Sequence, residues 1–370
     1  MSDRARFIMV GGFLGSGKTT SLGRLAGHFT DAGKRVGLIT NDQAEGLVDT
    51  LNLRSQGFSV EEIAGGCFCC RFNSLTEAAD KLSASGRPDI FLGEPVGSCT
   101  DLLATVAIPM KKLYGDRFDV APLTVLVDPI RAKKILTHQK RGGFSPKVSY
   151  IYRKQLEEAD AVAINKSDML DETETANLAR LIEENYPDTQ IFTFSARELD
   201  GMDKWFEYVS TQQKDWTETM DVDYDTYADG EAELGWLNSS CKVTSDSPFD
   251  PNQLLTDIAE GVKRRVQEAG GEIAHFKMTL MSGMDIGFVS LVANDAVPEL
   301  SQEIRNHLGE AEITLNGRAQ IAPESLQQFS EEAVAEASAA QNVSFEFLSV
   351  QAFRPARPEP VHRMNPTTTS

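Results

Sequence analysis

The sequence has no apolar run that approaches the ~18 residues of a membrane-spanning helix, and its first residues, MSDRARF, lack the apolar segment of a signal peptide. We therefore expect a cytoplasmic protein. Basic residues are also few, because 36 Lys and Arg stand against 55 Asp and Glu, which gives a net charge of −19. Such a surface repels nucleic acids and anionic membranes, so we expect neither as a partner.

Histidine and cysteine are scarce as well. The five histidines are scattered along the chain, which excludes a His-rich metal store. Five cysteines in a cytoplasmic chain of 370 residues do not indicate a disulfide framework. Three of them, Cys67, Cys69 and Cys70, nevertheless lie within four positions, and this spacing indicates thiolate chemistry or a metal site.

The most informative stretch is residues 7–20, FIMVGGFLGSGKTT. It matches G-x-x-x-x-G-K-[ST] from Gly12 to Thr19 and follows an apolar strand. In such a loop the backbone N–H groups surround a phosphate, Lys18 reaches the β- and γ-phosphates, and the Thr19 hydroxyl is a ligand of Mg²⁺. The residues expected to bind the nucleotide here are Gly12, Gly15, Ser16, Gly17, Lys18, Thr19 and Thr20.

A second motif, Asn165-Lys166-Ser167-Asp168, directly follows the apolar strand AVAI. It resembles the N-K-x-D element of GTPases, in which the carboxylate, here Asp168, accepts two hydrogen bonds from guanine. Adenine offers no such pair of donors, so the site discriminates between the two bases. Ser195 and Ala196 fit the S-A-[KR] element that contacts the guanine oxygen. Four residues such as NKSD are also common as a loop or helix cap.

Glu94 closes another strand and is followed by Gly97, in the pattern of the D-x-x-G element. In that element the acid orients a Mg²⁺-bound water and the glycine N–H senses the γ-phosphate. The alternative is a solvated Glu before a proline turn. Asp42 follows an earlier strand and is a further candidate ligand for Mg²⁺ or for a transferred metal. We assign catalytic roles to Lys18, Thr19 and Glu94.

The cysteine stretch GGCFCC, residues 65–70, narrows the function further. Its glycines allow a tight loop in which Cys67, Cys69 and Cys70 converge, and thiolates select Zn²⁺ and softer ions over Mg²⁺. Three ligands leave a fourth position open, which suits a site that releases its metal. A buried apolar cysteine cluster and a redox pair are the alternatives. Cys99 could add a thiolate, although a plain buried cysteine is the commoner interpretation, and Cys241 is expected in a core.

Apolar and helical segments alternate in the first half of the chain, which predicts an α/β domain with a mainly parallel sheet. Ligands bind such sheets at the carboxyl ends of the strands, where all these motifs fall. We expect a P-loop domain at 1–214, an acidic linker at 215–235, a smaller α+β ferredoxin-like domain at 236–355 and a disordered tail at 356–370. The expected strands of the first domain are 7–10, 35–40, 58–63, 89–92, 123–127, 161–164 and 191–194.

The order GGFLGSGKTT, GGCFCC, GEPVG, NKSD is similar to that of the CobW-like metallochaperone P-loop GTPases, relatives of UreG and HypB. This resemblance implies GTP hydrolysis with Mg²⁺, a Zn²⁺ or Co²⁺ ion on the three cysteines, and a client protein from a metalloenzyme or cofactor pathway. It also allows a homodimer. The chain departs from the family pattern at Asn41-Asp42-Gln43, where many members have an Asn-Glu-Phe-Gly-like stretch.

Two other functions remain compatible with the sequence. One is a P-loop NTPase whose cysteines form a redox switch. The other is a non-catalytic metal-binding or scaffold module that uses the nucleotide only for folding.

Overall fold

The computed structural model describes residues 4–41, 48–84, 86–137 and 143–366. Contacts divide the chain into two units: the first extends to residue 228 and takes in the tail from residue 358, and the second consists mainly of residues 229–357. The sequence puts the first boundary at 214 and the tail at 356. No helix in the described ranges is both long and apolar enough to span a membrane.

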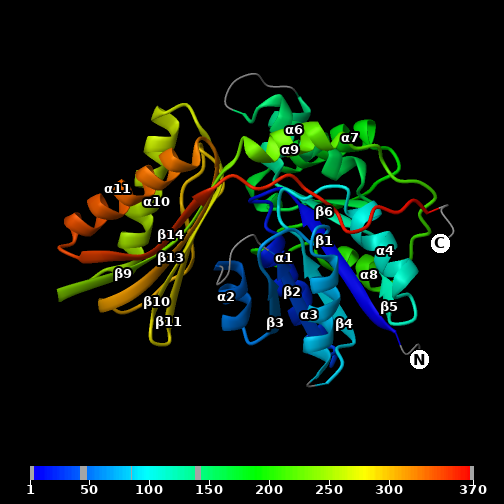
Figure 1. Ribbon diagram of the computed structural model, residues 1–370, viewed down its shortest axis with the longest axis horizontal. Coiled ribbons are helices and arrows are strands. Elements are labelled where there is room, and N and C mark those ends of the chain that lie inside the picture. The colour runs from blue at the N-terminus through cyan, green and yellow to red at the C-terminus, as the bar shows by residue number, and fades with distance from the viewer. Residues whose placement is uncertain (1–3, 42–47, 85, 138–142, 367–370) are drawn as a thin grey trace. The chain divides into compact units, whose positions relative to one another are not determined.

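The first unit is built on a parallel sheet with the strand order β3-β2-β4-β1-β6-β7-β8, and β5 pairs with β1 (Figure 1). This confirms the predicted α/β fold with its mainly parallel sheet. The short strand β5 was not predicted. The strands are β1 (Ala5–Gly12), β2 (Val36–Asn41), β3 (Ser59–Ile63), β4 (Ile90–Glu94), β5 (Phe118–Val120), β6 (Thr124–Val127), β7 (Ala161–Ile164) and β8 (Gln190–Thr193).

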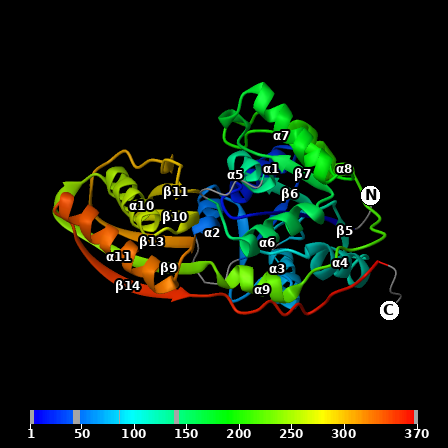
Figure 2. The same cartoon turned by 90° about the horizontal axis from the view of Figure 1, so that it is seen from above.

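Helices cover both faces of this sheet, as Figure 2 shows. All eight residues of β1 are buried, because a strand in a covered parallel sheet has no solvent face. Ile8 and Val10 pack with α1 and α8 on one face, and α3 and α6 lie on the other. The helices are α1 (Lys18–Asp31), α2 (Val48–Ser55), α3 (Phe72–Ala84), α4 (Ile108–Leu113), α5 (Pro129–Leu136), α6 (Pro146–Glu157), α7 (Glu172–Asn185), α8 (Asp203–Thr211) and α9 (Tyr224–Ala232).

The second unit is an antiparallel sheet of order β12-β11-β10-β13-β9-β14, with two helices on one face (Figure 1). Because β13 lies between β9 and β10, the chain forms the split β-α-β arrangement of a ferredoxin-like domain, and the predicted α+β class is confirmed. The elements are β9 (Gly235–Phe249), α10 (Pro251–Glu268), β10 (Glu272–Ser282), β11 (Asp285–Leu291), β12 (Glu299–Gln302), β13 (Leu308–Gln320), α11 (Pro323–Ala340) and β14 (Ser344–Phe353).

An apolar stripe on α10 explains its place in the second unit. Leu254, Ile258, Val262 and Val266 follow one another at intervals of four residues and are all fully buried. This period places them on one side of a helix, toward the sheet. The helix begins where the Asp250 carboxylate accepts hydrogen bonds from the first backbone N–H groups, a standard N-cap.

Candidate nucleotide and metal site

The glycine loop between β1 and α1 leaves no room for side chains at two positions. Gly12 and Gly17 have φ angles of 130° and 89°. A Cβ at Gly12 would lie 2.4 Å from the Leu126 carbonyl oxygen, and one at Gly17 would lie 2.2 Å from Asn165 Nδ2. Both conformation and space therefore require glycine here, which accounts physically for the motif spacing.

The Lys-Thr pair of this loop is buried at the first turn of α1. Lys18 Nζ donates to the Gly12 carbonyl oxygen at 2.9 Å, so the ammonium group is held within the loop. Ser16 Oγ is also buried and has no hydrogen-bond partner among the described residues. Thr20, which the sequence also assigns to the nucleotide, is exposed.

The side chain of Thr19, in the first turn of α1, meets the side chain of Glu94 at the end of β4. The Thr19 hydroxyl donates to Glu94 Oε1 at 2.9 Å, and both residues are 6% exposed. Glu94 ends β4, which pairs with β1 on one side and β2 on the other. The alternative of a solvated glutamate is therefore wrong, and two predicted Mg²⁺ ligands are neighbours. The third, Asp42, lies outside the described residues.

Gly97 lies against the phosphate loop. A Cβ at this position would be 2.6 Å from Leu14 Cδ2 and 3.0 Å from the Leu14 backbone nitrogen. The turn after β4 therefore contacts the phosphate loop directly, and because the two are closely packed, a displacement of one shifts atoms of the other.

Asn165 joins the phosphate loop to the NKSD loop and to the loop that carries Ser195 and Ala196. Its Nδ2 donates to the Ser16 carbonyl at 2.9 Å, and its Oδ1 accepts from the Ala196 N–H at 3.0 Å. Lys166 adopts φ 60° and donates through Nζ to the Gly15 carbonyl at 2.8 Å. The predicted NKSD and SA elements are thus brought to the phosphate loop by side chains that pair with its backbone.

Asp168 lies apart from these contacts, on the short helix η2 (Ser167–Met169). Its side chain is 25% exposed, and Oδ2 is 3.8 Å from Arg197 Nη1. The neighbouring Ser195 hydroxyl accepts the Glu198 N–H at 3.2 Å, which shapes the same loop. Asp168 can therefore present its carboxylate to a ligand without a rearrangement of the core.

Two residues that bond to the candidate nucleotide loops, Asp128 and Arg24, were not predicted from the sequence. Asp128, directly after β6, accepts from Lys166 Nζ at 2.9 Å. Burial alone would raise its pKa, but Lys166 and Arg131 outweigh this effect and lower the pKa. Arg24 on α1 donates to the Ala196 carbonyl at 2.9 Å. An acid at the end of the apolar run TVLV was a usable signal for Asp128, whereas nothing local marks Arg24.

The three cysteines converge in the loop between β3 and α3. Their Sγ atoms lie 2.7 Å (Cys67–Cys69), 3.0 Å (Cys67–Cys70) and 3.7 Å (Cys69–Cys70) apart. Gly65 and Gly66 adopt φ angles of 77° and 149°, as the tight loop requires. In the described part of the chain this is the one group of metal-type side chains that could surround an ion.

The thiols differ strongly in acidity because they hydrogen-bond to one another. Bonds from Cys69, then from Cys70 and Cys99, lower the pKa of Cys67 well below its usual value despite burial. The bond with Cys67 in turn raises the pKa of Cys69 well above the usual value and that of Cys70 to about 11. Of the three thiols, Cys67 therefore loses its proton most readily, because hydrogen bonds with its neighbours stabilise its thiolate.

The cysteine loop is fixed to the strand that carries Glu94. A Cβ at Gly93 would lie 3.3 Å from Phe68 Cε2, so the Phe68 ring rests on the backbone of β4 next to Glu94. Asn41, at the end of β2, donates to the Gly66 carbonyl at 2.6 Å. The cysteine loop thus packs against the ends of β2 and β4, and β4 is the strand that ends in Glu94.

The tail, for which the sequence predicts disorder, contacts the first unit. The Glu359 N–H donates to Cys70 Sγ at 3.2 Å, and the Val361 N–H donates to the Cys69 carbonyl at 2.9 Å. The His362 ring packs edge-on against Phe72, with 4.9 Å between centroids. These contacts are made mostly by backbone, and so leave no motif in the sequence.

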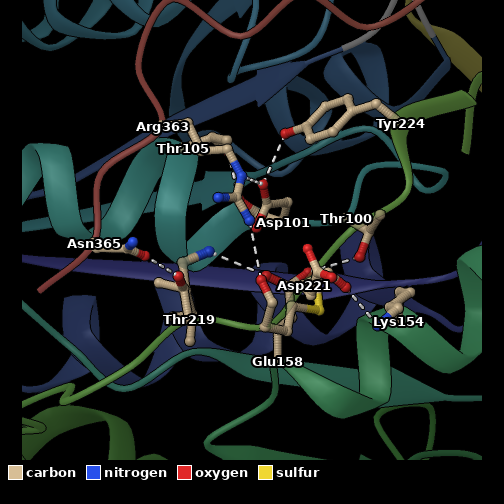
Figure 3. A network of polar contacts seen from close by, with 12 residues as sticks. Thr100, Asp101, Thr105, Lys154, Glu158, Thr219, Asp221, Tyr224, Arg363 and Asn365 are labelled. Carbon is tan, nitrogen blue, oxygen red and sulfur yellow. Dashed lines mark hydrogen bonds and ion pairs between the residues drawn. The ribbon is translucent and has the colours of Figure 1, made fainter.

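Farther along, the tail is held by a buried acid (Figure 3). Asp101 Oδ2 accepts from Arg363 Nε at 2.8 Å and from the Tyr224 hydroxyl at 2.7 Å. Nearby, Glu158 accepts from Thr100 Oγ1 at 3.2 Å. Burial raises the pKa of Asp101, while its two partners oppose that rise. The network ties the turn after β4 to two distant segments.

A glycine loop between a buried strand and a helix, with a Lys-Thr pair at its end and an Asn-Lys-x-Asp loop bound to it, defines a P-loop nucleotide-binding protein. The family model of the CobW/HypB/UreG nucleotide-binding domain matches residues 6–193. The chain belongs to this family, as the order of its motifs predicts.

Similarity to individual proteins was also found. The chain is 30% identical over 200 residues to the zinc chaperone YeiR of Escherichia coli (strain K12). The matched region covers 53% of this chain and 57% of YeiR. It thus spans less than two thirds of that relative's length. Among solved structures, HypB from Helicobacter pylori in complex with nickel is 22% identical, with a TM-score of 0.41. The match covers 57% of this chain and 93% of the HypB chain. Zn(II)-bound YjiA GTPase from E. coli is 15% identical over 91% and 99% of the two chains, with a TM-score of 0.32.

Proposed function

We propose that this protein hydrolyses GTP and delivers a divalent transition metal to a cytoplasmic client protein of a metalloenzyme or cofactor pathway. The observation that carries the proposal is the contact between the cysteine loop and β4, where Phe68 lies on Gly93 beside Glu94. A metal site and a nucleotide site that share one strand can respond to each other.

The metal is the cargo, held by Cys67, Cys69 and Cys70. Thiolates favour Zn²⁺ or Co²⁺ over the harder Mg²⁺, and the similarity to a zinc chaperone supports Zn²⁺. Uptake of the ion displaces thiol protons, so the affinity falls as the pH is lowered.

GTP is the nucleotide, with Asp168 accepting hydrogen bonds from the guanine N–H groups. Lys18 binds the β- and γ-phosphates, and the buried Ser16 hydroxyl, Thr19 and Glu94 provide oxygen atoms suited to phosphate and Mg²⁺. The Thr19 hydroxyl can keep its proton on Glu94 while its lone pair faces the ion. Bound Mg²⁺ would neutralise charge that develops on the phosphates during hydrolysis.

The coupling follows from contacts on both sides of Glu94. Gly97 lies on Leu14 of the phosphate loop, and Phe68 lies on Gly93. A shift of the turn after β4 on γ-phosphate loss therefore reaches the cysteine loop through packed atoms. Hydrolysis would then loosen the metal for the client.

The test measures Zn²⁺ and Co²⁺ affinity of the reduced full chain by competition with a chelating dye, with GDP and with a non-hydrolysable GTP analogue. We expect tighter binding with the GTP analogue, abolished by Cys69→Ser and retained by Cys241→Ala, since Cys241 is buried in the other unit. Equal affinity in both states would contradict nucleotide-gated delivery.

Two further variants separate the alternative functions. If Cys67→Ser left the metal content intact but removed sensitivity to oxidants, the cysteines would be a redox switch. If a folded Lys18→Ala variant kept full function in the cell, the nucleotide would serve only for folding.

A further inference from the structure

Residues 359–365 of the tail, which we call the strap, lie along the first unit. A terminal segment is well ordered only where other residues hold it, and here the backbone of the strap makes most of the contacts. They are Glu359 N–H to Cys70 Sγ (3.2 Å), Val361 N–H to the Cys69 carbonyl (2.9 Å), Met364 N–H to the Ala104 carbonyl (2.8 Å) and Lys112 Nζ to the Asn365 carbonyl (2.8 Å). The strap therefore extends from the cysteine loop to the helical segment η1 (Leu103–Ala107) and to α4.

A charged side chain anchors the strap near its end (Figure 3). Arg363 Nε donates to Asp101 Oδ2 at 2.8 Å, and Arg363 Nη2 donates to the Met220 carbonyl at 3.0 Å. The Asp101 side chain is 1% exposed, whereas that of Arg363 is 37% exposed. Departure of the arginine would leave the buried carboxylate without this cation, which is costly. We call this ion pair the latch, because it favours the bound position of the strap.

The strap meets the cysteine cluster at its least buried member. Cys67 and Cys69 are 8% and 1% exposed, and Cys70 is half-buried. An ion or a client ligand that approaches from solvent therefore reaches Cys70 first. Because the Glu359 N–H bonds to this sulfur and the Val361 N–H bonds to the neighbouring carbonyl, the strap occupies part of that approach.

The strap covers the cluster without contributing a ligand to it. Among the described residues, the side chains that could surround an ion are those of the three cysteines. Glu359 contacts Cys70 through its backbone N–H, and the His362 ring packs against Phe72. The strap can therefore lift without breaking a bond to the metal.

We propose that the strap is a gate on the metal site, which closes over Cys70 and has to lift before an ion enters or passes to a client. This inference rests on the proposed function. The latch determines how often the strap lifts, as a local opening during which the rest of the first unit stays folded. Because the strap is not a ligand, more frequent opening accelerates both uptake and release and leaves the affinity nearly unchanged. Loss of a metal ligand would lower the affinity instead.

The test uses the full chain in two matched pairs of variants. Arg363→Ala removes the latch, and Arg305→Ala is its control at an exposed arginine of the second unit. Glu359→Pro removes the N–H that bonds to Cys70, and Glu359→Ala keeps that N–H while removing the carboxylate. Thermal unfolding checks that each variant is folded. The measurements are the alkylation rate of Cys70 in the metal-free reduced protein, the rate of Zn²⁺ release to excess chelator, and the Zn²⁺ affinity by dye competition.

In Arg363→Ala and Glu359→Pro we expect Cys70 alkylation and Zn²⁺ release to accelerate at least ~5-fold, with both controls at wild-type rates. The Zn²⁺ affinity of Arg363→Ala stays within about twofold of wild type. Cys241, in the core of the second unit, is the reference in the same molecule, and its alkylation rate should not change.

The outcomes separate the gate from the proposed function. Wild-type rates in both strap variants, with Zn²⁺ binding still abolished by Cys69→Ser, would overturn the gate and leave the proposed function standing. An acceleration at Cys241 equal to that at Cys70 would also overturn the gate, because the whole fold would then be looser. A wild-type chain that binds no Zn²⁺ at its cysteines would overturn both.

Discussion

Gly93 offers a direct way to disturb the contact between the cysteine loop and β4. In Gly93→Ala the new Cβ would lie 3.3 Å from Phe68 Cε2 and 3.3 Å from Phe7 Cζ. Carbon atoms prefer ~3.5–4.0 Å, so both rings must shift by a few tenths of an ångström in a packed interior. Such overpacking typically costs about 1–2 kcal/mol, and the displacement of Phe68 also moves the two cysteines that flank it.

We therefore expect Gly93→Ala to lower the free energy of unfolding by about 1–2 kcal/mol and the Zn²⁺ affinity by about 10-fold. Denaturant unfolding and dye competition on the same preparations measure the two effects. Gly27→Ala is the matched control, because a Cβ on this α1 glycine meets nothing within 4 Å. It should stabilise the protein by about 0.5–1 kcal/mol through helix propensity and leave the metal affinity unchanged.

The outcome that would refute this reasoning is a Gly93→Ala protein whose metal affinity equals that of Gly27→Ala. Phe68 would then fill space without positioning the thiols. A loss of stability without a loss of affinity would also separate packing from metal binding.

Two further predictions concern the nucleotide site. Asn165→Ala leaves one carbonyl and two N–H groups, from three different loops, without their hydrogen-bond partner. GDP binding should therefore weaken by about 2–4 kcal/mol. Asn185→Ala, at an exposed position, is the control, and a loss of GDP affinity under threefold in Asn165→Ala would contradict the argument. Asp128→Asn should cost about 2 kcal/mol at pH 7, because the partly buried Lys166 loses the charge of its buried partner. The lowered pKa of Asp128 means that its contribution is present above pH ~4 and lost as the pH falls through the folded-state value. The stabilities of the two proteins should therefore converge in acid, and a difference that persists unchanged there would refute the ion pair.

The nucleotide and cysteine loops could be predicted because their chemistry is local. Positions 12 and 17 require glycine because of their backbone conformation and the lack of space for a side chain. The sequence motif therefore shows this requirement directly. The β-strands that carry the motifs are short apolar runs, and all seven expected strands of the first unit appear in the structure. The short strand β5 escaped prediction because three residues give too little periodicity.

Other parts depend on partners that are distant in sequence. Cys99 is typical of a buried cysteine in the sequence, and its effect on the pKa values of Cys67 and Cys69 depends on a turn that is distant from them along the chain. The tail has a composition typical of disorder, and its contacts with Cys69 and Cys70 use backbone groups that every residue has. The composition of a segment indicates whether it can form a core of its own. It does not indicate whether the segment can bind to a surface formed by the rest of the protein.

The tail also reaches the cysteine cluster late in synthesis. Glu359, whose N–H bonds to Cys70 Sγ, is 289 residues away from it along the chain. At 5–20 residues per second the ribosome needs about 15–60 s to make that interval. Throughout this time the thiols are already synthesised while the segment that covers them does not yet exist. A nascent chain therefore carries Cys69 and Cys70 before the backbone N–H groups of Val361 and Glu359, which bond to them, have been made.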